Sequence, residues 1–384
     1  MSRIFAYIRS TVRKVDPILM VCCAVLSVFS LVTVYGAVDN FGTSKLIMQL
    51  AMTLVGTALT FLIASIDFKN LVDKLWIWII IGSCAILAFT AIFGSSGASR
   101  ETTNKSWLII PLVNIGIQPS EFIKVTFICT LARHLASLKP GDINRPKKLL
   151  PLLAHAGIIS GFVLVSGDLG VALIYLSIVL IMFFSAGLSL WYYTGGITAT
   201  VLAMPFIWSK LAPYQQERII YGFNPYLDPT DKGWQPLTSL KAIQSGGPFG
   251  NGVFGGTHYE ALAASHTDFI LATFGEKFGF VGMLLLLAIC CIIIVRIIMI
   301  GFRSKDRFGM LVCVGVVASL FAQIIENVGM SIAVLPVVGI TFPFMSCGGS
   351  SVLGVYIMMG LIHSIYSHSS NTSFRSSKSF GLSQ

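Results

Sequence analysis

The sequence predicts an all-α integral membrane protein, a polytopic bundle of ten transmembrane helices with a long extracytoplasmic loop between the seventh and the eighth. Hydrophobic residues make up 55% of the 384 positions, charged residues make up only 11%, and the mean hydropathy is +0.83. This composition is far from that of a soluble domain. Apolar runs recur from residue 18 to residue 366, and basic residues concentrate in alternate connections. Together these patterns define a single membrane domain, 1–366.

A helix that crosses the hydrocarbon core needs roughly 20 apolar residues. Ten segments meet this length: 18–37, 46–66, 75–94, 119–137, 151–167, 168–187, 189–209, 279–300, 310–330 and 342–366. The fifth and sixth run together, and Ser166, Gly167 and Asp168 supply the only turn signal between them. Merging them would give nine helices. An even number agrees better with two termini that have the same charge bias.

The basic residues set the expected orientation. With the N-terminus inside, the inner segments hold 15 Lys and Arg against five acids, whereas the outer segments hold seven of each. This is the positive-inside pattern, which places both termini in the cytoplasm. The formal net charge of +10 therefore predicts contact with anionic membrane lipids and not with nucleic acid. The Ser-rich tail, 367–384, is expected to be disordered.

Two outer connections, 95–118 and 210–268, are long enough to carry function. In the first, the apolar stretch WLIIPLVNIGI is too short to span. It is expected either to lie in the membrane interface, with Trp107 at headgroup depth, or to form a hydrophobic plug over the bundle. We count Trp107 among the candidate substrate-binding residues.

Ionisable residues near apolar runs are expensive, so each needs a reason. Arg133 and Arg296 lie near inner helix ends, where long side chains can snorkel to the surface. Glu121 and Lys124 are three residues apart at an outer helix start and can pair on one face. A structural pair and a grip on a polar headgroup both remain open for these two residues.

Two further acids have a structural and a functional interpretation. Asp168 opens a predicted helix, where a carboxylate is favoured by the helix dipole, so a capping role competes with substrate binding. Glu326 lies deep in the ninth predicted helix, and helical spacing places Gln323, Asn327 and Met330 on roughly the same face. This polar stripe is expected to face protein or water and not lipid.

The outer connection 210–268 holds three candidate features. Its Gly-rich part, SGGPFGNGVFGG, would cradle phosphate if its N–H groups converged, but it lacks a Walker A or Rossmann pattern and a flexible loop is the simpler interpretation. Arg218 offers a planar fork for phosphate, or a structural pair with Glu217 or Asp228. Asp268 lies at the boundary between this connection and a helix, where a half-buried carboxylate is well placed as a general base toward a sugar hydroxyl.

The segment NVGMSIAVLPVVGITFPFMSCGGSS, residues 327–351, closely resembles the signature of the SEDS family, which includes RodA, FtsW and SpoVE. The resemblance covers nearly the whole chain and is strongest to the RodA branch. Other matching motifs follow in order: VDPIL at 15–19, QPSEFIKV at 118–125, GDLGVAL at 167–173, QERI at 216–219, and HTDFI with GEKFGFVG within 266–282.

This resemblance implies a multi-pass protein of the bacterial cytoplasmic membrane. It implies a peptidoglycan glycosyltransferase that polymerises lipid II with release of undecaprenyl pyrophosphate, for cell-wall elongation and shape. It also implies a class B penicillin-binding protein as the transpeptidase partner. The family's catalytic aspartate matches Asp268, and its functional residues match Glu121, Lys124, Asp168 and Arg218. A divalent cation, Mg or Mn, is a possible cofactor, since departing phosphates require positive charge.

Three other functions compete with an elongation polymerase. A division- or sporulation-specific polymerase would share every motif. A lipid II flippase would depend more on intramembrane acids such as Glu326 than on Asp268, because the coupling groups of transporters lie near the midplane. A scaffold that only recruits the penicillin-binding protein would tolerate substitution of Asp268.

Overall fold

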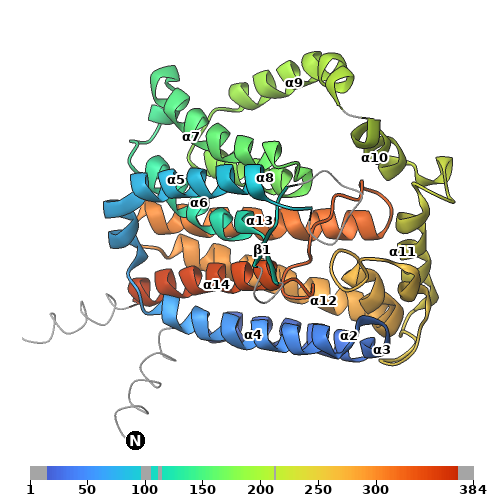
Figure 1. Cartoon of the computed structure of the whole chain (residues 1–384). Coiled ribbons are helices and arrows are strands. Elements are labelled where there is room, and N and C mark those ends of the chain that lie inside the picture. Colours follow the sequence, from blue (N-terminus) through green and yellow to red (C-terminus); the bar gives the residue numbers. More distant parts are fainter. Residues whose placement is uncertain (1–14, 97–104, 111–114, 212, 371–384) are drawn as a thin grey trace, which may run out of the picture.

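The computed structural model describes residues 15–96, 105–110, 115–211 and 213–370, and they are mostly helical (Figure 1). The helices are α2 (Pro17–Tyr35), α3 (Val38–Phe41), α4 (Thr43–Ala64), α5 (Phe68–Phe93), α6 (Pro119–Ala136), α7 (Pro146–Val165), α8 (Leu169–Ser185), α9 (Leu190–Lys210), α10 (Pro213–Phe223), α11 (Trp234–Ser245), α12 (Ile270–Phe302), α13 (Arg307–Ser331) and α14 (Gly349–Ser370), with short 3-10 turns η1 (Asp142–Asn144), η2 (Pro225–Leu227) and η3 (His258–Ala261). The one sheet in this part of the chain is a hairpin, β1 (Leu108–Ile110) and β2 (Ile115–Ile117).

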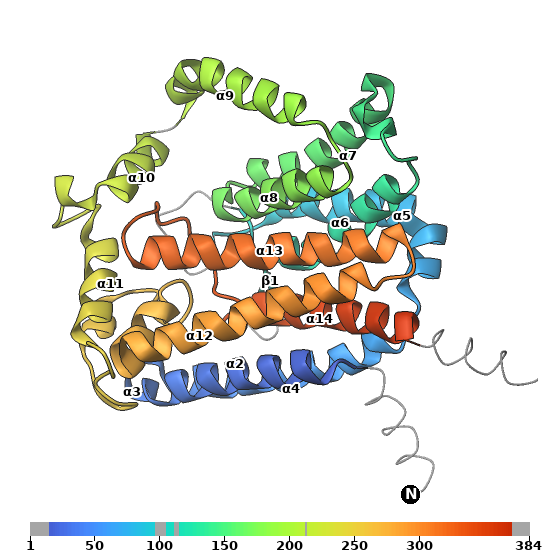
Figure 2. The same ribbon diagram turned by 180° about the vertical axis from the view of Figure 1, so that it is seen from behind.

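The helices form a bundle with α13 at its centre. α13 packs against α8, α12 and α6, while α14 packs along α4, and Figures 1 and 2 show α13 between α8 and α12 from both sides. The outer helices present large apolar side chains to the surroundings: Leu54 on α4 is 62% exposed and Trp78 on α5 is 70% exposed. Such surfaces suit lipid and not water.

Helices occur at all ten predicted segments. Within the described ranges, seven helices are long and apolar enough to cross a membrane: α2, α4, α5, α7, α12, α13 and α14. α8 is a shorter apolar helix of the same bundle. The structure thus confirms a mostly helical, multi-pass membrane fold, and ten crossings stay a prediction.

The turn between the fifth and sixth predicted segments is confirmed. α7 ends at Val165, Gly167 has a φ of 84°, and the Asp168 side chain caps α8. Glycine adopts a positive φ more easily than any other residue. Gly167 therefore allows the chain to turn between α7 and α8. The merged, nine-helix interpretation is therefore wrong.

The structure differs from the prediction at the starts of α5, α12 and α14 and in the outer stretch after Trp107. The segment 342–348 is not helical, so the last helix begins only at Gly349. α12 begins at Ile270, nine residues early, and the non-helical angles of Gly279 (φ 68°, ψ −170°) kink it. The outer stretch after Trp107 forms a hairpin in which Leu108 pairs with Ile117.

Two arginines form ion pairs with aspartates. Arg296 does not snorkel to the surface as predicted, because its guanidinium donates three hydrogen bonds to the fully buried Asp16 carboxylate at 2.6–3.1 Å. This pair joins the start of α2 to α12. Arg133 is partly exposed, forms an ion pair with Asp73 and lies over the Trp76 ring.

Two helices stand apart from the bundle. In Figures 1 and 2, α9 and α10 arch away from α8 and α13. No described side chain of α9 is buried. The connection that leads toward Asp268 therefore leaves the bundle before it returns through α11.

Candidate active site

The two described ends of the chain lie together, since the Asp16 N–H donates to the His363 ring on α14 at 3.1 Å. We call this side of the bundle the terminal end. α6, α8, α12 and α14 all start at the opposite side, the loop end, where α13 finishes (Figure 1). The sequence-predicted site residues with described side chains lie mostly at the loop end.

Glu121 and Lys124 form a buried ion pair in the first turns of α6. The Lys124 Nζ lies 2.9 Å from the Glu121 Oε2, and the two side chains are 0% and 3% exposed. Pro119 occupies the first helical position, where its missing N–H costs nothing. The structural pair that the i, i+3 spacing predicts is therefore present, and Lys124 offers no exposed ammonium group.

Asp168 connects α8 to α6. Its carboxylate accepts hydrogen bonds from the Val171 N–H at 3.1 Å and from the Gln118 side-chain amide at 2.7 Å. The Gln118 N–H in turn donates to Ser350 Oγ at the start of α14, 3.0 Å away. The N-termini of α6, α8 and α14 therefore meet at one place.

Helix N-termini carry partial positive charge. Those of α6 and α8 are each occupied by an acid of this chain, Glu121 and Asp168, whereas the first turn of α14 has no acid. The first turn of α14 carries the hydroxyl groups of Ser350 and Ser351 instead. An anion at this junction would be favoured by α14 in particular.

Asp268 lies two residues before α12 and is partly exposed. Its Oδ2 lies 3.5 Å from where a side chain on Gly339 would begin, and Gly339 has a φ of 74°. The same non-helical segment also touches Gly170 of α8 through Val338 and Ile340. Residues 338–340 therefore connect Asp268 with the helix that Asp168 caps.

The Gly-rich loop is neither a free phosphate cradle nor a loose connection. In the loop itself, the Asn251 and Gly252 N–H groups donate to the backbone carbonyls of Glu276 and Lys277 at 3.0 and 3.1 Å. The N–H groups of the three residues that directly follow the loop, Thr257, His258 and Tyr259, converge on the Glu276 carboxylate at 2.8–3.0 Å. The Ser245 hydroxyl and the His258 ring complete its surroundings. Converging backbone N–H groups do bind an anion here, but the anion is a side chain of the protein itself.

The neighbouring Lys277 holds the same loop from the other side. Its Nζ donates to the carbonyls of Gly36 and Gly255 at 3.0 and 3.3 Å and lies 4.5 Å from the centre of the Tyr259 ring. The Glu276 side chain is 0% exposed and the Lys277 side chain is 1% exposed. These two buried charges therefore fix the loop to the start of α12.

Three predicted residues lie outside this junction. Trp107 forms a bridge with Ser95, and its ring lies against Gly116 in the hairpin. Glu326 is partly exposed on α13, and its Oε2 has no hydrogen-bond partner in the described part of the chain. Arg218 lies on α10, and its side chain is outside the described residues. Glu217, one of its two predicted partners, pairs with Lys232 at 3.5 Å.

The predicted polar stripe on α13 faces protein, and one of its residues, Asn327, bonds the backbone next to Asp268. Gln323, Asn327 and Met330 are all 0% exposed. The Asn327 amide donates to the backbone carbonyls of Asp268 at 2.8 Å and Ile340 at 2.6 Å. The predictions did not include Asn327 among the site residues, although its motif was part of the family signature.

The described residues contain no group of three or more His, Cys, Asp or Glu side chains that could hold a metal ion. The Glu121 and Asp168 carboxylates are taken by Lys124, Gln118 and Val171. A tight Mg²⁺ or Mn²⁺ site therefore does not fit these residues, and the divalent cation stays a prediction.

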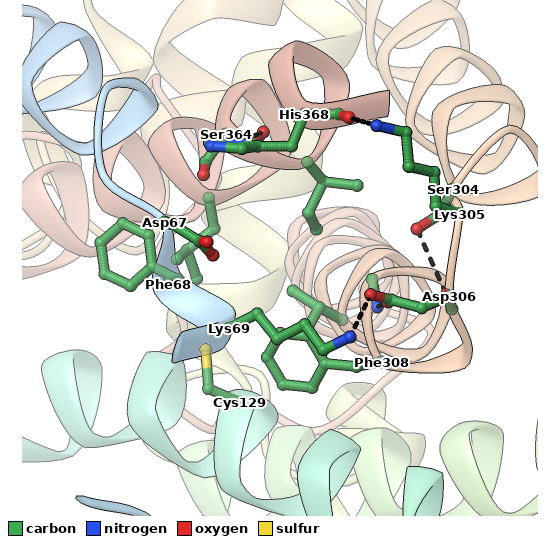
Figure 3. Close-up of a pocket in the computed structure, with 14 residues that line it drawn as sticks. Asp67, Phe68, Lys69, Cys129, Ser304, Lys305, Asp306, Phe308, Ser364 and His368 are labelled. Atoms are coloured by element: carbon green, nitrogen blue, oxygen red, sulfur yellow. Dashed lines mark hydrogen bonds and ion pairs between the residues drawn. The ribbon is translucent and has the colours of Figure 1, made fainter. Parts of the chain in front are cut away.

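A cavity of about 220 Å³ lies at the terminal end, far from the junction (Figure 3). The residues that line it include Phe68, Phe308 and Cys129, and also Lys69 and Asp306, which form an ion pair at 2.7 Å. No predicted site residue lines it. This cavity is thus separate from the sequence-predicted site residues.

Fold and site together define a polytopic α-helical membrane protein with buried, mutually bonded polar residues at one end of its bundle. The family model for the FtsW, RodA and SpoVE cell cycle proteins matches residues 14–371. The chain belongs to this family.

Similar proteins and a solved structure agree with this family assignment. The peptidoglycan glycosyltransferase MrdB of Escherichia coli strain K12 is 32% identical over 365 residues, covering 92% of this chain and 94% of that protein. A probable peptidoglycan glycosyltransferase FtsW of Trichlorobacter lovleyi is 30% identical over 361 residues, covering 91% and 92%. A chain solved in work on the structural coordination of polymerization and crosslinking by a peptidoglycan synthase complex superposes with a TM-score of 0.80 at 25% identity, covering 93% of this chain and 98% of that one.

Proposed function

We propose that this protein is a peptidoglycan glycosyltransferase of the bacterial cytoplasmic membrane that polymerises lipid II, with Asp268 as the general base. The observation that carries the proposal is the position of Asp268. It is a partly exposed carboxylate at the loop end, linked through residues 338–340 to the junction of the α6, α8 and α14 N-termini. Relatives named as peptidoglycan glycosyltransferases match over more than nine tenths of the chain.

The proposed reaction requires one base and positive potential near the leaving group. The 4-hydroxyl of one sugar attacks the anomeric carbon of another, a C–O bond forms, and the bond to the lipid pyrophosphate breaks. Asp268 takes the hydroxyl proton, and the electron pair of the broken bond leaves on the pyrophosphate. Such proton transfer contributes about 10²–10⁴-fold to a rate.

The leaving pyrophosphate would be stabilised by the N-terminus of α14, whose first turn has no acid, and by Arg218. Lys124 can contribute only if its pair with Glu121 opens, because its ammonium group is buried and bound. We therefore propose that Glu121, Lys124 and Asp168 hold the N-termini of α6, α8 and α14 together and do not contact the pyrophosphate directly. Trp107, in the neighbouring hairpin, would contact the lipid-linked substrate at headgroup depth.

The cellular role is cell elongation with a class B penicillin-binding protein as partner. The solved relative comes from a complex that couples polymerization to crosslinking, which supports such a partner. The similarity to MrdB (32%) is only slightly higher than that to FtsW (30%). The preference for elongation therefore rests mainly on the connection before Asp268, where the spacing of PYLDPTDKGW, KAIQSGG and GGTH resembles that of RodA.

The test is polymerisation of labelled lipid II by the purified protein in detergent, with and without its candidate partner, alongside lipid II transport in liposomes. We expect long glycan strands. Transport of lipid II with no polymer under any partner or cation condition would instead support a flippase that depends on Glu326, whose buried Oε2 is the observation that favours this alternative.

A further inference from the structure

Three consecutive backbone carbonyls that lead to the candidate base are each held by a distant part of the chain. The His266 carbonyl accepts from the Cys347 N–H at 2.8 Å. The Thr267 carbonyl accepts from the Ser346 hydroxyl at 2.6 Å, and the Asp268 carbonyl accepts from the Asn327 amide at 2.8 Å. We call these three hydrogen bonds the carbonyl clamp.

The side chains of the clamp are chemically specific. The Asn327 Nδ2 bonds two carbonyls, those of Asp268 and Ile340, so it uses both of its hydrogens. The Ser346 hydroxyl donates to Thr267 and accepts from the Phe342 N–H at 2.7 Å. Both side chains are almost fully buried, 0% and 1% exposed, so water cannot readily replace either one.

The clamp also fixes what the carboxylate faces. Asn327 holds the Ile340 carbonyl, which directly follows Gly339, the residue beside the Asp268 Oδ2. A side chain at position 339 would be strained by the φ of 74° and would approach the carboxylate. One amide group thus sets the spacing between Asp268 and the segment that touches α8.

We propose that Asn327 and Ser346 are positioning residues that orient Asp268 for proton transfer; this inference rests on the proposed function. The carbonyls of residues 266–268 precede α12, and the side chains of these residues are partly exposed. Helix formation in α12 therefore does not itself require these three bonds. A base displaced by about 1 Å can lose about 10²-fold in rate.

The experiment compares steady-state lipid II polymerisation by Ser346→Ala, Ser346→Thr and Asn327→Leu with that of the wild type. We expect Ser346→Ala and Asn327→Leu to lower kcat by about 10- to 100-fold, with KM for lipid II changed less than about threefold. Ser346→Thr keeps the hydroxyl donor and should recover most of kcat. The matched control is Ser319→Ala, a 0% exposed serine on α13 with no hydrogen bond in the clamp.

Each result decides the question. The proposal fails if Ser346→Ala has the wild-type kcat, or if Ser346→Thr loses as much kcat as Ser346→Ala. It also fails if a rise in KM for lipid II accounts for the whole loss of activity. The thermal midpoint of each variant separates lost orientation from lost fold, and a midpoint that falls in step with kcat also counts against it. Asp268→Asn runs in parallel: if it stays active, the proposed base fails, whereas an inactive Asp268→Asn beside a fully active Ser346→Ala refutes only the clamp.

Discussion

At the scale of single residues, Glu276 shows how a buried charge can build a loop. Its carboxylate is 0% exposed and accepts from three consecutive backbone N–H groups, the Ser245 hydroxyl and the His258 ring. A carboxylate without such donors would be costly to bury. The loop that Glu276 organises therefore accounts for its burial among apolar residues.

Replacing Glu276 by Gln should destabilise this loop. The amide turns an acceptor into a donor that faces backbone N–H groups, so the variant should lose about 1–3 kcal/mol or more of stability. Limited proteolysis of residues 246–262 and the thermal midpoint in detergent would measure it. Glu260→Gln, an exposed acid of the same loop, is the control, and equal effects of the two substitutions would refute the special role of Glu276.

His266 makes a pH-dependent prediction. Partial burial and the nearby Lys45 charge lower the pKa of His266 to about 4, from the ordinary histidine value of about 6.5. Because the folded protein binds this proton less well than the unfolded chain, stability falls as the pH drops from about 6.5 to 4 and is unaffected above that range. In His266→Gln this part of the acid loss should disappear. A variant that differs from the wild type only above pH 7 would contradict the assignment.

At the scale of helices, the Asp16 and Arg296 pair joins α2 to α12. Burial alone would raise the pKa of Asp16, but hydrogen bonds from Arg296 and the Leu19 N–H hold it below its ordinary value. The carboxylate therefore stays charged inside the bundle. A buried carboxylate of this kind depends on its partner.

Removing that partner should be costly. We expect Arg296→Met to lower stability by about 3–5 kcal/mol, since it leaves Asp16 buried and unpaired. Lys69→Met removes the exposed pair with Asp306, whose side chains are 48% and 36% exposed, and should cost at most about 1 kcal/mol. Thermal unfolding in one detergent would compare them, and a larger effect at Lys69 would refute the ranking.

Hydropathy located the spanning helices well because a bilayer demands length and apolarity, but it could not resolve their ends. The stretch 342–348 is as apolar as a helix, yet it is extended or turned and supplies part of the carbonyl clamp. The start of α12 was missed because Glu276 and Lys277 interrupt its apolar pattern. Their partners on the Gly-rich loop and at Gly36 are distant in sequence.

The candidate site was predictable in part. Motif resemblance identified Glu121, Asp168 and Asp268, and helical spacing alone predicted the Glu121 pair. Nothing local in the sequence connects Asn327 to Asp268, 59 residues away, or Ser346 to Thr267, 79 residues away. These bonds depend on how α13 and its following segment fold back over the start of α12.

At the scale of the whole molecule, polar chemistry gathers at the loop end and both described chain ends gather at the other. The inner segments carry 15 Lys and Arg against five acids, which predicts that the terminal end faces the cytoplasm. The junction of the α6, α8 and α14 N-termini would then face outward, where glycan strands are assembled.

Reporter fusions test this orientation. A fluorescent protein that folds only in the cytoplasm should be bright when fused after residue 384, and alkaline phosphatase at the same position should be inactive. A phosphatase inserted into the exposed stretch near Asp231 should be active and serves as the control. Active phosphatase at the C-terminus would reverse the assignment.

The central claim is that Asp268 accepts the proton of the attacking hydroxyl. The most direct measurement is single-turnover polymerisation of labelled lipid II by wild type, Asp268→Asn and Asp268→Glu at matched substrate occupancy. We predict that Asp268→Asn binds lipid II normally but loses about 10²–10⁴-fold in rate, while Asp268→Glu retains partial activity because it can still accept a proton. Strands formed by folded Asp268→Asn at the wild-type rate would contradict the account.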